Sequence, residues 1–294
     1  MKPKFNMKIV LAVLSVIALI LFILLFSTNM VLFDPKGIVG LQQENLIIIS
    51  VLLMAIIIVP VLIMSVYFPY KYRHSNKEEE YKPKWEHSTK IEVIVWTIPC
   101  LIVLALGIIT YRTAFSLDPR NEIVSDKDPI TVQVVAMNWK WLFIYPEYQI
   151  ATINELHFPV NRPVKFLVTS DTTMNSFFIP QLGSQVYAMA GMENRINLMA
   201  TEQGTYRGMS ANYSGYGFAN MRFQAHVSTE QAFDQWVEQV KSSDKILNNS
   251  SYAWLSGNSH DQIEAPHPVT YFSSVDPLRF KDIIEQHSGV QNGL

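Results

Sequence analysis

The chain has 294 residues, of which 16% are charged and 49% are hydrophobic, whereas soluble domains average about 25% charged residues. Its formal net charge of -2 argues against a nucleic-acid partner. The single cysteine, Cys100, excludes a disulfide framework within one chain. Cys100 lies in an apolar stretch, where packing is its expected role. The shortage of charge therefore points to a membrane protein.

Three stretches without any charged residue account for this shortage. Each approaches the roughly 20 residues that a helix needs to cross a hydrocarbon core of about 30 Å. They cover residues 9–26, 46–68 and 93–111. Buried core helices are the alternative, and we disfavour them because all three stretches would lack a polar face. Pro60 and Pro99 lie within the last two stretches, where membrane helices tolerate proline. The sequence therefore predicts transmembrane helices over 46–68 and 92–112.

The first stretch admits two interpretations, a secretory signal or a helix that stays in the mature chain. A short basic start before an apolar stretch fits a signal. However, no A-x-A cleavage site follows Phe26, and Ser27, Thr28 and Asn29 include no cysteine that could accept a lipid. We therefore favour a retained helix within segment 1–28, followed by an external loop over 29–45.

Basic residues in the loops predict the orientation, because positively charged loops stay in the cytoplasm. Lys2, Lys4 and Lys8 precede the first stretch, and six further Lys and Arg residues lie between residues 71 and 90. The loop before the second stretch offers only Lys36. This places the N-terminus and the 69–91 loop in the cytoplasm, and everything from Arg112 onward on the outer side.

From residue 130 onward the pattern changes to short alternating or aromatic stretches separated by Pro, Gly, Asn and Asp. This pattern is typical of an all-β sandwich or barrel. Breakers such as residues 161–163 and 202–204 mark turns. Strands are expected over residues 130–137, 141–145, 164–170, 176–179, 195–200, 205–208 and 221–227. Seven short strands suit a Greek-key sandwich, which we place at 125–228.

Residues 229–294 form a C-terminal extension for which the sequence predicts helices. The sequence from Ser228 to Gln231 resembles a helix N-cap with an acid close behind. Residues 245–268 are polar and typical of a loop. The stretch 277–287 is amphipathic and predicts a last helix, whose apolar face carries Leu278, Phe280, Ile283 and Ile284.

The β domain offers few side chains for chemistry. Its histidines between residues 130 and 227 are His157 and His226, it contains no cysteine, and its carboxylates are sparse. For His226 a surface or packing role is favoured over a role as a metal ligand. The methionines of the domain are expected to fill its core, because no His or Cys lies nearby in sequence to complete a copper site. No G-x-S-x-G motif surrounds a serine, so the domain has no visible active site of its own.

Five motifs follow one another between Asp34 and the last predicted helix. They are residues 34–37 (DPKG), 90–99 (KIEVIVWTIP), 137–141 (MNWKW), 175–180 (NSFFIP) and 182–192 (LGSQVYAMAGM). Together they resemble subunit II of the bo-type ubiquinol oxidases, in the cytochrome c oxidase subunit II family of the haem-copper oxidase superfamily. The resemblance implies a membrane α-helical anchor, followed by an all-β, cupredoxin-like Greek-key sandwich with C-terminal helices. It also implies a bacterial cytoplasmic (inner) membrane, with the β domain on the periplasmic side.

The resemblance extends to a copper centre that cytochrome c oxidase members of the family carry. In those relatives a histidine precedes a Ser-Phe-x-Ile/Val-Pro stretch, and a later loop reads C-x-x-x-C-x-x-x-H-x-x-M. The corresponding positions here hold Asn175, Ser210, Asn212, Ser214, Phe218 and Met221. Only the methionine matches the copper-bearing pattern. Since serine hydroxyls cannot replace bridging thiolates, we expect this chain to bind no metal.

By resemblance, the chain is expected to be a non-redox structural subunit of a proton-pumping terminal quinol oxidase of the aerobic respiratory chain. Quinol would deliver electrons directly to haem in subunit I, which would hold the haems and a copper. Subunit I, the other subunits and membrane lipid are the expected partners, and this chain is expected to hold no catalytic residue. Trp139 and Trp141 are interpreted as packing residues. The haem type, the choice between ubiquinol and menaquinol, and any quinol-contacting residue are not visible in this sequence.

Two single positions carry further expectations. Glu92 lies at the cytoplasmic mouth of the third helix, where carboxylates tend to face protein or water-filled paths. By resemblance it would lie near the entrance of a proton channel in subunit I, and a pairing with Lys90 or solvent is the alternative. Thr28 occupies the place where many similar subunits carry a lipidated cysteine, so no lipidation is expected.

Two other functions were weighed against this one. The first is a membrane-tethered binding or assembly protein that uses a cupredoxin-like domain for docking, and only the family resemblance argues against it. The second is a copper-carrying cytochrome c oxidase subunit, and Ser210 and Ser214 argue against it.

Overall fold

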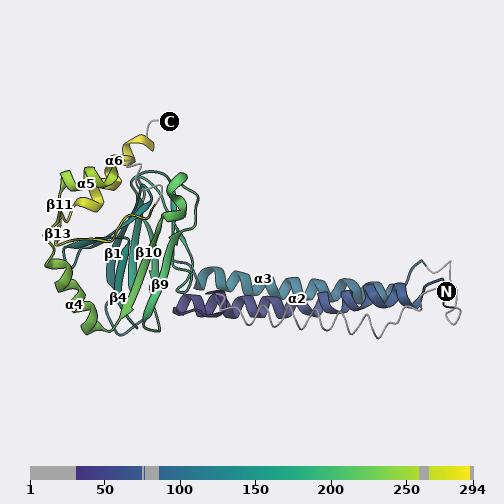
Figure 1. Ribbon diagram of the computed structural model, residues 1–294. Coiled ribbons are helices and arrows are strands. Elements are labelled where there is room, and N and C mark those ends of the chain that lie inside the picture. The colour runs from purple at the N-terminus through teal and green to yellow at the C-terminus, as the bar shows by residue number, and fades with distance from the viewer. Residues whose placement is uncertain (1–30, 75, 77–85, 258–264, 292–294) are drawn as a thin grey trace, which may run out of the picture. The chain divides into compact units, whose positions relative to one another are not determined.

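The computed structural model describes residues 31–74, 76, 86–257 and 265–291 (Figure 1). The chain divides into two compact units. Among the described residues, the first unit contains Asn45–Ser116, and the second contains Val31–Glu44 together with the residues from Leu117 onward. The apolar stretch 9–26 and Thr28 lie outside the described residues.

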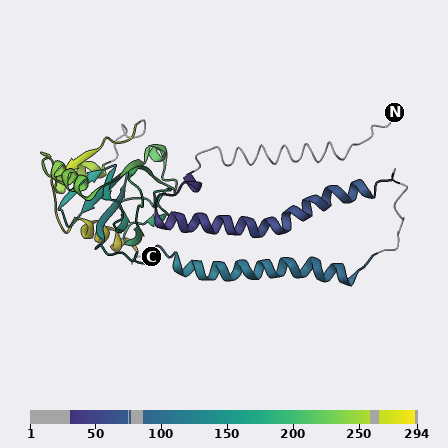
Figure 2. The ribbon, with the colours of Figure 1, turned by 90° about the horizontal axis from the view of Figure 1, so that it is seen from below.

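The first unit contains α3 (Thr89–Ser116) and the part of the long helix α2 (Ile38–Lys71) from Asn45 onward (Figure 2). Both extend beyond the expected spans at each end, and the prolines inside them do not end the helices. By length and composition these two described helices can cross a membrane, and their buried residues are Gly40 in α2 and Ile102 in α3. A rise of about 1.5 Å per residue makes each helix longer than the roughly 30 Å of a hydrocarbon core. Their exposed apolar surface is suited to lipid or to partner helices.

The second unit is a β sandwich (Figure 1). One sheet has the strand order β12-β3-β2-β1-β5-β8, and the other has the order β4-β10-β9-β6-β7. Most neighbouring strands are antiparallel, whereas β1 pairs with β5, and β4 with β10, in parallel. The strands of the sandwich are β1 (Ile130–Met137), β2 (Lys140–Tyr145), β3 (Ile150–Ile153), β4 (Glu155–Pro159), β5 (Val164–Ser170), β6 (Asn175–Phe178), β7 (Val186–Ala188), β8 (Asn194–Leu198), β9 (Gly204–Ser210), β10 (Arg222–Ser228) and β12 (Thr270–Phe272).

All seven strands expected from the sequence are confirmed, two of them with the expected ends and the others with ends shifted by at most two residues. The sequence analysis did not predict β3, β4 and β7. A single residue, Asn154, separates β3 from β4, and its positive φ of 57° turns the chain there. Asparagine tolerates this left-handed conformation better than most residues. Because the turn contains no run of breakers, nothing in the local composition marks the end of one strand and the start of the next.

The core between the two sheets is rich in aromatic side chains. Alternate residues of β1 and β2 face it, namely Ile130, Val132, Val134, Ala136, Trp141, Phe143 and Tyr145. From the other sheet, Phe177 and Phe223 stack with ring centroids 5.4 Å apart and an interplanar angle of 3°. Trp141 meets both of these rings edge-on. Each such side chain contributes about 1.5–3 kcal/mol through burial, so the sandwich is a firm frame for its loops.

The C-terminal extension contains the predicted helices and also short strands. Its elements are α4 (Glu230–Lys241), β11 (Ile246–Leu247), α5 (Asn249–Ser256), β12, β13 (Ser274–Val275) and α6 (Arg279–Gln291). The predicted N-cap is confirmed, since the Thr229 hydroxyl accepts a hydrogen bond from the Ala232 N–H at 3.2 Å. Residues 245–268, expected to be a loop, include β11 and α5. Strands of two or three residues are too short to show a period, and β12 forms because it pairs with the free edge of β3.

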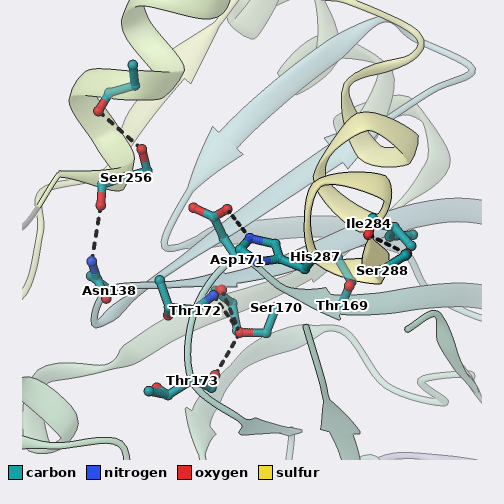
Figure 3. Close-up of polar contacts among 12 residues, drawn as sticks. Asn138, Thr169, Ser170, Asp171, Thr172, Thr173, Ser256, Ile284, His287 and Ser288 are labelled. Atoms are coloured by element: carbon teal, nitrogen blue, oxygen red, sulfur yellow. Dashed lines mark hydrogen bonds and ion pairs between the residues drawn. The ribbon is translucent and has the colours of Figure 1, made fainter. Parts of the chain in front are cut away.

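The extension also covers the outer face of the six-stranded sheet and builds a second core there. From the sheet, the second core takes Val135, Met137, Leu142 and Ile144, and from the extension it takes Leu255, Phe272, Phe280 and Ile283. Figure 3 shows His287 of α6 beside Asp171, with His287 Nε2 3.3 Å from Asp171 Oδ1. The middle of β1 and β2 is therefore buried on both faces.

The segment before α2 belongs to the same unit and packs on its loops. The Lys36 N–H donates to the Gln181 carbonyl at 2.7 Å, and the Lys36 carbonyl accepts from Thr201 N–H at 2.8 Å. A Cβ atom on Gly37 would lie 2.5 Å from the Leu182 carbonyl oxygen. The 34–37 motif therefore packs directly against the start of the 182–192 motif.

Candidate functional site

The loop after β9 and the short helix η2 (Tyr216–Asn220) form the region in which the family resemblance places the copper ligands of relatives. β6 pairs with β9 and brings Asn175 to the start of this loop. Trp139 Nε1 donates to the Ser214 carbonyl at 3.0 Å. A Cβ atom on Gly217 would lie 2.3 Å from the Trp139 ring, so only glycine fits there. The indole of Trp139 therefore holds the loop in place.

Hydrogen bonds connect several of the positions that the sequence analysis singled out. The Ser210 hydroxyl lies 3.0 Å from Asn175 Oδ1 and 3.1 Å from the Asn212 carbonyl oxygen, and it can donate to either. Ser210 and Asn175 are almost fully buried, with exposed fractions of 4% and 1%. The Ser214 hydroxyl lies 3.9 Å from the sulfur of Met221. The structure thus brings Asn175, Ser210, Ser214 and Met221 together around one loop.

The remaining two positions lie at the edge of this cluster. Asn212 turns its side chain outward and donates from Nδ2 to the Met174 carbonyl at 3.0 Å. Phe218 packs edge-on against Tyr213, with ring centroids 5.6 Å apart.

The donor atoms of this cluster do not suit a copper pair. At the six positions, the side-chain groups that could bind a metal are amides, hydroxyls and one thioether. Copper in electron-transfer centres prefers thiolate and imidazole ligands, and hydroxyl groups remain protonated and bind it weakly. Ser210 Oγ donates to Asn175 Oδ1 instead, and Asn175 Nδ2 donates to the Thr173 carbonyl. Hydrogen bonds between neutral side chains therefore hold this loop. A copper pair would instead need ionised ligands at these positions.

The two tryptophans of the MNWKW motif both pack. Trp141 is fully buried in the sandwich core. Trp139 lies partly buried against the loop. It belongs to the turn between β1 and β2, where its φ is positive, at 54°. The expected packing role thus agrees with both positions, and Trp139 also positions the loop.

Comparisons with known proteins identify the family. A family model described as "Cytochrome C oxidase subunit II, periplasmic domain" matches residues 147–227. "Cytochrome bo(3) ubiquinol oxidase subunit 2" of Pseudomonas putida is 49% identical over 271 residues, which are 92% of this chain and 85% of that protein. "Ubiquinol oxidase subunit 2" of Acetobacter aceti is 46% identical over 274 residues, 92% of this chain and 86% of that protein. "Quinol oxidase subunit 2" of Bacillus subtilis (strain 168) is 39% identical over 246 residues, 83% of this chain and 75% of that protein.

This chain belongs to the quinol oxidase subunit 2 family. All six positions that the resemblance matches to copper ligands of relatives lie within the residues that the family model matches. The external β domain of this quinol oxidase subunit is thus a sandwich of the cytochrome c oxidase subunit II type, and its α2 and α3 are the expected membrane helices.

Glu92 lies in the first turn of α3, as expected. Its side chain is 49% exposed, and its carboxylate pairs with Nδ1 of His87. The other ring nitrogen of His87 lies 3.3 Å from the Thr89 hydroxyl. Lys90 or solvent was the expected alternative partner, whereas the structure places His87 beside the carboxylate.

One cluster of ionisable side chains was not predicted from the sequence. Glu155 and His157 lie on β4, and His226 lies on β10, with one ligand atom of each within 4.8 Å of the others. The alternation of residues 155–158 between polar and apolar side chains was the available signal for β4. No local pattern reveals that β10 pairs with β4.

Proposed function

We propose that this chain is a structural subunit of a terminal quinol oxidase in a bacterial cytoplasmic membrane and that it carries no electrons itself. A quinol dissolved in the membrane delivers electrons to haem in subunit I, and the external domain supports that subunit from the periplasmic side. Two quinols reduce one dioxygen to two waters and leave two quinones. Subunit I holds the haems and a copper, carries out this reaction and pumps protons.

The observation that carries the proposal is the buried hydrogen bond from Ser210 to Asn175. Relatives that pass electrons through this domain need ionised sulfur and imidazole ligands at these two positions. A neutral hydroxyl group and a neutral amide satisfy one another and offer no site for an electron. The relatives named above are quinol oxidase subunits, which supports the same conclusion.

The test compares two electron donors on the purified complex. We expect it to oxidise ubiquinol rapidly and reduced cytochrome c not at all. Elemental analysis after a chelator wash should give one copper atom per complex, which subunit I would hold. A purple complex with three copper atoms, or steady oxidation of cytochrome c, would contradict the proposal.

Co-purification tests the rival function, a membrane-tethered docking or assembly protein. Under the proposed function, the chain extracted in mild detergent copurifies with a haem-bearing protein in a fixed ratio, and the visible spectrum shows that haem. A chain that purifies without haem from aerobically grown cells would favour the docking role.

We further propose that Glu92 lies near the entrance of a proton path in subunit I. Its position in the first turn of a membrane-spanning helix supports this role, because carboxylates at that depth tend to face protein or water. The contact with His87 places an imidazole ring beside this carboxylate.

A further inference from the structure

The pairing of β4 with β10 gathers three side chains of the metal-ligating kinds on one face of the five-stranded sheet. Side chains two residues apart on a strand point to the same face, so Glu155 and His157 lie together. Leu156 and Phe158, on the opposite face of β4, are fully buried in the sandwich core. In the parallel register of β4 and β10, His226 lies directly beside His157.

The distances between the ligand atoms are close to those of a metal site. His157 Nε2 lies 2.8 Å from Glu155 Oε1, and His226 Nε2 lies 3.9 Å from Glu155 Oε2. Zinc bonds of about 2.0–2.1 Å in a tetrahedral site separate the ligand atoms by about 3.3 Å. Small side-chain rotations would therefore place an ion among the three groups.

Neighbouring side chains hold the three groups in place. His226 Nδ1 lies 2.9 Å from the Thr205 hydroxyl, which leaves Nε2 directed at Glu155. The Tyr271 hydroxyl donates to Glu155 Oε1. The His157 ring stacks on Trp236, with ring centroids 4.2 Å apart and an interplanar angle of 11°. Partners of this kind fix the orientation and the tautomer of metal ligands in proteins.

The cluster is reachable from solvent and has the charge that a cation needs. His157 and His226 line an open hollow together with Thr205, Gln235, Trp236 and Gln239. The side chain of His226 is 32% exposed. Burial lowers the pKa of His226, and the neighbouring His157 lowers it further. Burial favours the neutral form of Glu155, but hydrogen bonds from His157 and Tyr271 outweigh it and leave the pKa of Glu155 below its ordinary value.

We propose that Glu155, His157 and His226 form a zinc site on the external domain, with water completing the coordination. Two imidazoles and one carboxylate are a ligand set that zinc uses in proteins with an open fourth position. The site joins β4 to β10 and, through Tyr271 and Trp236, to the C-terminal extension. Bound zinc would therefore strengthen the attachment of that extension to the sandwich.

The test is a zinc titration of the full chain, purified in detergent without a histidine tag and stripped with a chelator. We expect one zinc ion per chain by calorimetry and by elemental analysis, and a higher melting temperature with zinc. His226→Ala and Glu155→Gln should each weaken zinc binding at least tenfold. Tyr271→Phe, which removes only the supporting hydroxyl, should weaken it by about tenfold.

His287→Ala is the matched control, because His287 also lies beside a carboxylate, that of Asp171. The His287→Ala chain should bind zinc with the same affinity as the unchanged chain. His226→Gln provides the same comparison should His226→Ala unfold. A chain without stoichiometric zinc binding would overturn the proposal, and so would equal affinities in the unchanged chain and the folded His226 variant. The readout does not depend on oxidase activity.

Discussion

Lys140 is fully buried on β2, next in sequence to Trp139 and Trp141. Burial lowers the pKa of its ammonium group from 10.5 to about 8. Unfolding returns the lysine to water and to its ordinary pKa. Between pH 8 and 10.5 the unfolded chain therefore binds more protons than the folded chain. The contribution of Lys140 to the free energy of unfolding therefore increases as the pH rises from 8 to 10.5.

Lys140→Met isolates this contribution, because methionine has similar length and no proton to lose. We expect the melting temperature of the unchanged chain to rise relative to that of Lys140→Met between pH 8 and 10.5, by the equivalent of at most about 3 kcal/mol. Thermal unfolding of both chains in detergent, followed by circular dichroism at several pH values, measures the difference. A difference that does not change with pH would rule out the lowered pKa.

Glu92 is the residue at which proton uptake can be tested. We expect Glu92→Gln to slow quinol-dependent turnover of the assembled complex several-fold, because the amide cannot carry a proton, while the haem content stays unchanged. Oxygen consumption by the purified complex measures turnover. Glu86→Gln, which changes an exposed carboxylate just before α3, is the control and should leave turnover unchanged. Unchanged turnover in Glu92→Gln would end the proton-path proposal.

At the scale of the elements, β9 and β10 depend on one glycine. Gly208 lies opposite Phe223 in the antiparallel register of these strands. A Cβ atom on Gly208 would lie within 2.4 Å of three Phe223 ring atoms. The Phe223 ring fills the space that a side chain would occupy, and it stacks on Phe177 of β6. This contact joins three strands and fixes the start of the loop that holds Ser210.

Gly208→Ala should lower the free energy of unfolding by about 1–3 kcal/mol, because the Phe223 ring must move within a close-packed core. Gly107→Ala is the matched control, since a Cβ atom there meets no other atom within 4 Å. Denaturation of the full chain in detergent compares the two. Equal stability of both variants would show that the Phe223 ring is not held over Gly208.

At the scale of the whole molecule, the second unit needs its C-terminal extension to cover a sheet. The outer faces of β1 and β2 carry apolar residues such as Val135 and Leu142, which are fully buried only because the extension packs on them. Phe280 in α6 is 4% exposed and belongs to this second core, whereas Leu278, two residues earlier, is 60% exposed. The amphipathic face predicted for 277–287 thus includes one residue that stays in solvent.

Phe280→Ala should destabilise the second unit by about 3–5 kcal/mol, through lost burial and the cavity that remains. Leu278→Ala removes a side chain of similar size from the surface and should change the stability little. Melting temperatures of the two variants test this difference, and limited proteolysis should cleave the extension faster in Phe280→Ala. Equal effects would show that the extension is not packed on the sheet.

Much of this architecture follows from local patterns. Charge-free stretches predict α2 and α3, because a helix in lipid must be apolar on all sides. Alternation predicts β1 and β5 with the observed ends, and the side chain of Thr229 predicts the start of α4. The positions around Ser210 were found through a family resemblance and not from the residues alone, since neutral amides and hydroxyl groups have no signature of their own.

The tertiary structure decided what depends on pairing between distant segments. The register of β4 and β10 places His226 beside His157, and β12 joins the edge of β3. A sequence pattern reports which face of an element is apolar, but the choice of neighbour depends on the packing of the whole sheet. For the same reason, the sequence determined a membrane anchor followed by a β sandwich, whereas only the fold brought Glu155, His157 and His226 together and built the second core.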